Sequence, residues 1–111
     1  MEIISASEGL SKRDIVKLTD SYGYEKPADH EGEVFDIVQY VIYMDTNKDG
    51  EEVKRLRFVT DSGTVIGTSS GVMISKFEKL LNELGMPLTE VEIESSVSKN
   101  FGNKYYFLTL K

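Results

Sequence analysis

Three basic residues, Lys54, Arg55 and Arg57, lie within four positions near the middle of the chain. The segment around them is rich in β-branched and apolar residues, which is typical of a strand. Because side chains alternate along a strand, Arg55 and Arg57 are expected on the face opposite Leu56. Cationic groups grouped on one sheet face can bind phosphate, and a solvent-exposed sheet face without a ligand is the alternative.

Aromatic residues flank the basic segment in the strands and turns expected around it. Nucleobases of a single strand stack on exposed rings, each contributing roughly 1–3 kcal/mol, while basic residues follow the phosphate backbone. Rings in small β-proteins more often belong to the core, so each is a candidate for either role. The flanking aromatic residues are Tyr40, Tyr43, Phe101, Tyr105 and Phe107.

The turn at 98–104 combines both residue types, because Phe101 lies there between Lys99 and Lys104. An exposed phenylalanine flanked by lysines is harder to explain by packing than a ring inside a strand. In the strand that follows, Tyr106 and its alternate neighbours are expected to face the core, which leaves Tyr105 on the other face.

A third pattern, Asp45-x-Asn47-x-Asp49-Gly50, matches the first half of a calcium-binding EF-hand loop. The match fails further on, because the position of the bidentate glutamate is occupied by Leu56. A polar hairpin turn closed by Asp49-Gly50 explains the same residues. A hairpin turn is therefore expected, with a calcium site as the minor alternative.

Residues for catalysis are scarce. The chain has no cysteine and a single histidine, His30, in a polar loop. It contains no P-loop, no G-x-G-x-x-G motif and no nucleophile elbow. The alternating Glu90, Glu92 and Glu94 are explained by a charged edge strand. We therefore expect no enzyme activity, no metal and no cofactor.

Charge is unevenly distributed along the 111 residues, whose net charge is −6. Residues 1–36 contain nine acidic and four basic residues, so the rest of the chain is nearly neutral. A local basic surface is compatible with this distribution. With no secretory signal pattern, no membrane-spanning apolar run and no cysteine, the chain is expected to be a cytoplasmic protein.

Periodicity predicts the order of the elements. A short helix is expected to begin after Ser11, which forms a capping-box pattern with Asp14, and to end at residues 21–23. A second helix is expected over 73–84, where apolar residues recur with a period of 3.6. Strands are expected at 34–44, 51–60, 64–69, 89–97 and 104–111.

This order favours a mostly β domain with two helices. Five short strands can close into an OB-fold barrel, with the helix at 73–84 covering one end and the long strand at 34–44 bending to serve two sheets. We expect one domain over residues 1–111, in which 1–32 is an N-terminal helical extension and loop.

Several segments resemble the small OB-fold single-stranded DNA-binding proteins of phages and mobile elements. They are IISASEGLSKRDIVKLT, VQYVIYMDTNKDGEEVKRL, SGVMISKFEKLL and SKNFGNKYYFLTL. The resemblance implies a protein that coats single-stranded DNA during replication without sequence preference. It also implies a binding groove formed by the second and third strands and by the turns at 45–52 and 98–104.

The leading hypothesis is therefore a non-enzymatic single-stranded DNA-binding protein, with replication proteins as further candidate partners. Phosphate contacts are expected from Lys54, Arg55, Arg57, Lys99 and Lys104. Base stacking is expected on Tyr43, Phe101 and Tyr105. The alternative is an OB-fold protein-interaction module that binds a host or replication protein through an acidic N-terminal helix.

Overall fold

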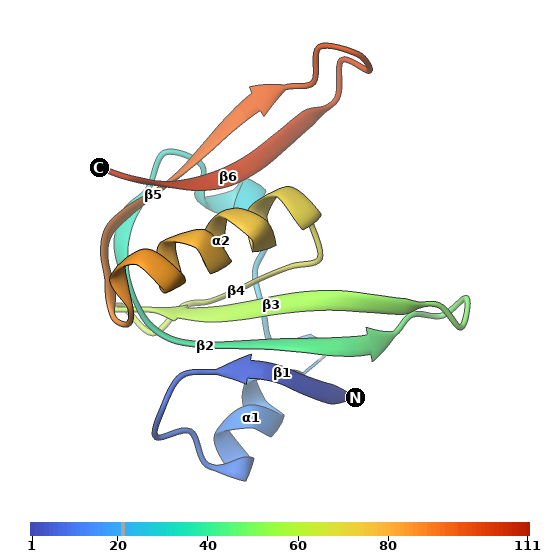
Figure 1. The fold of residues 1–111 in the computed structure, drawn as a ribbon, viewed down its shortest axis with the longest axis vertical. Helices are drawn as coiled ribbons and strands as arrows, with labels where there is room; N and C mark the ends of the chain where they lie inside the picture. Colours follow the sequence, from blue (N-terminus) through green and yellow to red (C-terminus); the bar gives the residue numbers. More distant parts are fainter. Residues whose placement is uncertain (21) are drawn as a thin grey trace.

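The computed structural model describes residues 1–20 and 22–111. It is mostly β, with two α-helices and one short 3₁₀ helix (Figure 1). The elements in chain order are β1 (Glu2–Ala6), α1 (Lys12–Leu18), η1 (Pro27–His30), β2 (Val34–Thr46), β3 (Glu52–Thr60), β4 (Val65–Thr68), α2 (Gly71–Leu84), β5 (Leu88–Val97) and β6 (Lys104–Leu110).

All six strands belong to one antiparallel sheet with the order β4-β3-β2-β5-β6, to which β1 is added beside β2. The long strand β2 changes neighbours along one edge. Its first part, 34–37, pairs with β5, and its later part, 41–44, pairs with β1. The register shifts between Ile37 and Gln39, where β2 curves away from the β5–β6 hairpin (Figure 1). The strand bends, as expected, but the expectation that it serves two sheets is wrong, because all its partners belong to one sheet.

The sheet is not closed, so the expected five-stranded barrel is not observed. Closure would require pairing between β4 and β6, and no such pairing occurs among the described residues. Part of the free edge of β4 is occupied instead by Glu25, whose amide donates to the Val65 carbonyl and whose carbonyl accepts from the Gly67 amide, both at 2.9 Å. Two of the edge groups that a closing strand could use are therefore already paired.

Residues 22–33, which we call the strap, cross the opening between the two ends of the sheet. One end of the strap lies on β4 through Glu25, and the other lies on β5, where the Gly32 amide donates to the Ile93 carbonyl at 2.8 Å. His30 links two parts of the strap, because its ring nitrogens lie 2.9 Å from carboxylate oxygens of Glu25 and Glu33. The loop expected here is thus an ordered connection between distant strands.

Helix α2 forms the main core with the sheet. Its N-cap, Ser70, accepts a hydrogen bond from the Met73 amide, and Gly85 with φ 71° ends the helix. Met73 and Phe77 of this helix are buried in the main core. Figure 1 shows α2 between the β2–β3 layer and the β5–β6 hairpin. The apolar face expected from the 3.6-residue period is confirmed, except that Leu84 is exposed.

The N-terminal segment covers the opposite face of β2 and β3. Residues 2–6, part of the expected helical extension and loop, form strand β1 because β2 offers them a free edge. Five residues alone give little local signal. Helix α1 begins at Ser11 with the expected capping box to Asp14, and its one buried residue is Leu18. The helix ends there, while Ser21, part of its expected end at residues 21–23, lies outside the described residues.

Candidate nucleic-acid interface

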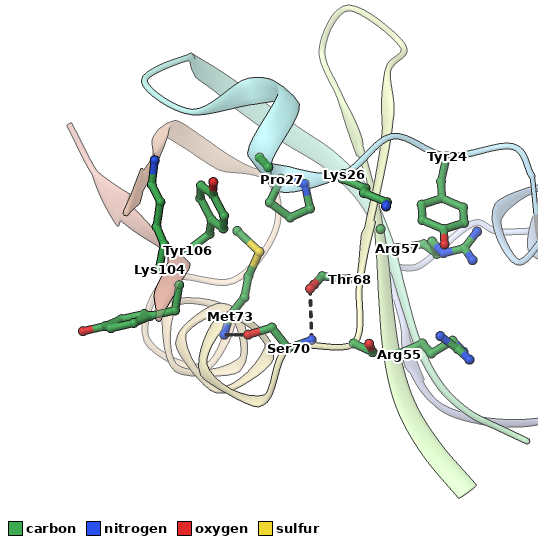
Figure 2. Close-up of a pocket in the computed structure, with 14 residues that line it drawn as sticks. Tyr24, Lys26, Pro27, Arg55, Arg57, Thr68, Ser70, Met73, Lys104 and Tyr106 are labelled. Carbon is green, nitrogen blue, oxygen red and sulfur yellow. Dashed lines mark hydrogen bonds between the residues drawn. The ribbon is translucent and has the colours of Figure 1, made fainter. Parts of the chain in front are cut away.

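A pocket of about 370 Å³ opens between β4 and β6, where the sheet fails to close. The strap, β3, β4, the start of α2 and β6 all contribute to it (Figure 2). Its volume is at the lower end of the range found for small-ligand sites. The lining residues are Tyr24, Lys26, Pro27, Ala28, Arg55, Arg57, Gly67, Thr68, Ser69, Ser70, Met73, Lys104, Tyr105 and Tyr106.

The charge of this lining differs from that of the whole chain. Four lining residues are basic, namely Lys26, Arg55, Arg57 and Lys104, and none of the lining residues is acidic. The chain as a whole carries a net charge of −6. Such local concentration of one sign in a cleft attracts ligands of the opposite sign. The pocket is therefore suited to an anion.

Arg57 is held by internal contacts and is only 4% exposed. Its Nη1 donates to the Leu18 carbonyl at 3.0 Å and to the Asp20 carbonyl at 2.7 Å, next to the C-terminal end of α1. Its guanidinium carbon lies 3.7 Å from the centre of the Tyr24 ring. The expectation of a freely accessible phosphate contact is wrong for Arg57, because α1 and Tyr24 cover the side chain.

Tyr43 is also misplaced by the sequence-based prediction. Its side chain is 1% exposed and packs with Leu18 and Val41 in the small core beneath α1. Its hydroxyl has no hydrogen-bond partner among the described residues, and burial raises the pKa of this phenol. Tyr43 is therefore a core residue, because strand β2 is covered on both faces. The alternation of residues in the sequence does not show that α1 packs on the second face.

Arg55 and Lys54 lie on opposite faces of β3, as their alternation predicts. The Arg55 Nε donates to Asp45 Oδ2 at 3.1 Å, while its two terminal amino groups have no partner among the described residues. Arg55 thus lines the pocket with unused donors. Lys54 points to the α2 side and donates to both Glu78 carboxylate oxygens at 3.1 and 3.2 Å. Lys54 is therefore not part of the pocket.

Lys104 and its neighbours form the β6 side of the pocket. Lys104 Nζ lies 2.8 Å from Glu31 Oε1 on the strap, and this contact lowers the pKa of Glu31 and raises that of Lys104. Tyr106 packs against the main core, as expected, while Tyr105 is half-buried beside Phe107 with ring centres 6.0 Å apart. The side chains of Lys104 and Glu31 are 51% and 40% exposed, so the pair is weak and a stronger anion can replace the carboxylate.

The turn at 98–104 lies at the tip of the β5–β6 hairpin, which extends away from the body of the molecule (Figure 1). Phe101 is 79% exposed, and Lys99 is exposed as well. Neither residue lines the pocket. The predicted set is thus divided: Arg55, Arg57, Lys104 and Tyr105 line the pocket, Lys99 and Phe101 lie at the hairpin tip, and Tyr43 and Lys54 lie elsewhere.

The sequence-based prediction missed the strap residues Tyr24 and Lys26 and the hydroxyls of Thr68 and Ser70. The Thr68 hydroxyl accepts from the Ser70 amide at 3.0 Å, and the Ser70 hydroxyl accepts from the Met73 amide at 3.4 Å (Figure 2). Each hydroxyl therefore keeps its proton for donation to a ligand. The sequence gives little indication that Tyr24 and Lys26 belong to a binding site, because only the pairing of Glu25 with β4 brings them to the pocket.

The calcium alternative at 45–49 is not supported by the hairpin between β2 and β3. Asn47 Oδ1 accepts from the amides of Asp49 and Glu51, at 2.9 and 3.0 Å, and Asp45 Oδ2 accepts from Arg55. The side-chain oxygens that a calcium ion would need as ligands therefore already accept hydrogen bonds within the hairpin. Within the described ranges, no group of three or more metal-binding side chains is present.

The acidic helix of the alternative hypothesis is also corrected. Helix α1 has three basic residues and one acidic residue, Asp14, and the acidic excess lies mainly in the strap and its flanks.

Among the residues that the structure describes, no helix is long and apolar enough to cross a bilayer. Comparison of the chain with protein-family models, curated proteins and solved structures gives no match.

Proposed function

We propose that this chain binds single-stranded nucleic acid, without sequence preference and without enzyme activity, through the pocket between β4 and β6. The observation that carries the proposal is the lining itself: four basic residues and three tyrosines, with no carboxylate. A single strand offers phosphates and flat bases in alternation, which is the combination that such a lining complements. A ligand with phosphate alone leaves the aromatic component unexplained.

The shape of the pocket supports an extended ligand. Figure 2 shows Arg55, Arg57 and Tyr24 on one side of the Thr68–Ser70 segment and Met73, Tyr106 and Lys104 on the other. Basic groups therefore lie at both ends of the pocket. In this proposal Lys26, Arg55 and Lys104 contact phosphate, while Arg57 holds the structure beneath them.

The strand arrangement also supports an opened form of the OB-fold in this proposal. Strands β2 to β6 follow the order strand, strand, strand, helix, strand, strand, with a long curved first strand. OB-folds are partly open barrels that bind oligonucleotides on one side. The resemblance to phage and mobile-element proteins would place this activity in DNA replication, in the cytoplasm of the cell where replication takes place.

Fluorescence anisotropy of a labelled oligo(dT) at 50 mM salt tests the proposal. We expect binding by the wild-type chain and about fivefold weaker binding for Arg55→Ala and for Lys104→Ala, the change expected from losing one phosphate contact of about 1 kcal/mol. Lys54→Ala is the matched control, since it removes the same charge from the opposite face of the same strand. No binding by the wild type, or equal losses in all three variants, would refute the proposed site.

A further inference from the structure

Tyr24 differs from the other tyrosines of the pocket because a buried cation supports one face of its ring. The guanidinium of Arg57 lies 3.7 Å from the ring centre, and Arg57 is 4% exposed while Tyr24 is half-buried (Figure 2). The face of Tyr24 against Arg57 is therefore covered, and its solvent-accessible part lies elsewhere on the ring. Stacking of this kind stabilises the ring in one orientation.

The backbone that follows Tyr24 is held in place as well. Glu25, the next residue, is hydrogen-bonded to Val65 and Gly67 of β4. A Cβ at Gly67 would lie 2.7 Å from Tyr24 Cδ2 and 2.6 Å from Arg57 Cδ, so the absence of a side chain at Gly67 makes room for the stacked pair. A ring held by stacking and by its backbone loses little conformational freedom when it binds a ligand.

The ring also lies at a boundary between two hollows. Tyr24 lines the basic pocket, and it also lines a second hollow beside Ser62, Thr64 and Val65. A ligand that extends from the basic pocket into the second hollow therefore passes Tyr24. Two other candidate rings are less suited to this position, since Tyr106 packs against the core and Phe101 is at the hairpin tip.

We propose that Tyr24 is a preformed stacking platform for a nucleobase, with Arg57 as the residue that positions it. This inference rests on the proposed function and identifies a binding residue for it. The Arg57 guanidinium contacts the ring on one face, and the base stacks on the accessible remainder. Stacking on a ring tolerates any base, which agrees with binding that lacks sequence preference.

The absence of tryptophan from the chain allows a direct test. Tyr24→Trp and Phe101→Trp each introduce a single indole, one at the proposed platform and one at the exposed hairpin tip. On titration with unlabelled oligo(dT), we expect quenching of the indole fluorescence in Tyr24→Trp that saturates with the anisotropy curve. A saturating quench in Phe101→Trp with an unchanged signal in Tyr24→Trp would overturn the platform.

Affinity provides the second readout. Tyr24→Ala is expected to weaken oligo(dT) binding about 5- to 150-fold, whereas Tyr24→Phe keeps the ring and should bind like the wild type. Phe101→Ala is the control for an exposed ring away from both hollows, since Phe101 lines neither of them and is 79% exposed. Chemical denaturation shows whether each variant is folded. If Tyr24→Ala does not fold, the fluorescence titration of Tyr24→Trp decides the question. Oligo(dT) binding that is equal in Tyr24→Ala and wild type would overturn the platform alone, while no binding by the wild type would overturn both the platform and the proposed function.

Discussion

At the scale of single residues, Arg55 and Arg57 show how two arginines with the same orientation acquire different roles. Both point to the same face of β3, but Arg57 donates to two backbone carbonyls and is covered, whereas Arg55 donates through Nε to Asp45 and keeps its terminal amino groups free among the described residues. Burial and partner type, rather than residue type, distinguish a structural cation from one that can bind a ligand.

Substitution of each arginine by alanine should separate the two roles. Arg57→Ala leaves the carbonyls of Leu18 and Asp20 without their donor, and we expect a loss of about 2–4 kcal/mol in the free energy of unfolding. Arg55→Ala removes a partly exposed pair and should cost less than about 1 kcal/mol. Urea denaturation measures both values, and equal losses would contradict the assignment.

Gly67 is the residue on which the contact between the strap and β4 depends. A side chain there would meet Arg57 and Tyr24 atoms at 2.6–2.7 Å, so Gly67→Ala should lower the free energy of unfolding by about 1–3 kcal/mol. Gly71→Ala is the matched control, because its Cβ would have no neighbour within 4 Å. Urea denaturation of the two variants is the measurement; a Gly67→Ala protein as stable as the control would show that the stacked pair can move aside without cost.

At the scale of elements, local patterns predicted local structure and failed where distant segments meet. The period of α2, the Ser11 capping box and the alternation of Leu56 with Arg57 all depend on residues within a few positions. Strand β1 depends on pairing with β2, about forty residues away, and the strap depends on pairing with β4. The barrel prediction failed for the same reason, since the sequence does not indicate that Glu25 occupies the edge of β4.

The strap itself should respond to pH through His30. Hydrogen bonds from the ring to Glu33 and Glu25 raise the pKa of His30 above its usual 6.5, because they favour the protonated form. A raised pKa means that this stabilisation is complete below pH 6.5 and is lost as the pH rises through the pKa of the folded state. We expect a decrease of no more than about 1 kcal/mol, because both carboxylates are more than half exposed.

Denaturation of the wild type and His30→Gln at pH 6 and pH 8.5 measures this contribution. The glutamine variant keeps a polar side chain but cannot gain a proton, so the difference in stability between the two proteins should shrink at the higher pH. A stability difference that stays constant or grows with pH would show that the contacts of His30 with Glu25 and Glu33 do not depend on the charge of His30.

At the scale of the whole molecule, the proposed binding of an acidic polymer by an acidic chain requires that the chain separate its own charges. The carboxylates of the strap and its flanks are partly paired internally, with Glu31 on Lys104 and with Glu25 and Glu33 on His30. The basic lining of the pocket lies beside them without an acidic member. Repulsion from the net charge of −6 should slow association with nucleic acid, while the short-range contacts determine the affinity once the strand has docked.

Salt dependence therefore gives a prediction for the molecule as a whole. The proposed phosphate contacts are three, from Lys26, Arg55 and Lys104, and each contact on a single strand contributes about −0.7 to the slope. A plot of the logarithm of affinity against the logarithm of salt concentration should therefore have a slope of about −2. This slope corresponds to a loss of about 20-fold between 50 and 200 mM salt. Anisotropy with oligo(dT) across that range measures it, and Arg55→Ala should make the slope shallower by about 0.7, whereas Lys54→Ala should leave it unchanged. A slope near zero with tight binding would mean that stacking alone holds the strand and that the basic lining does not contact phosphate.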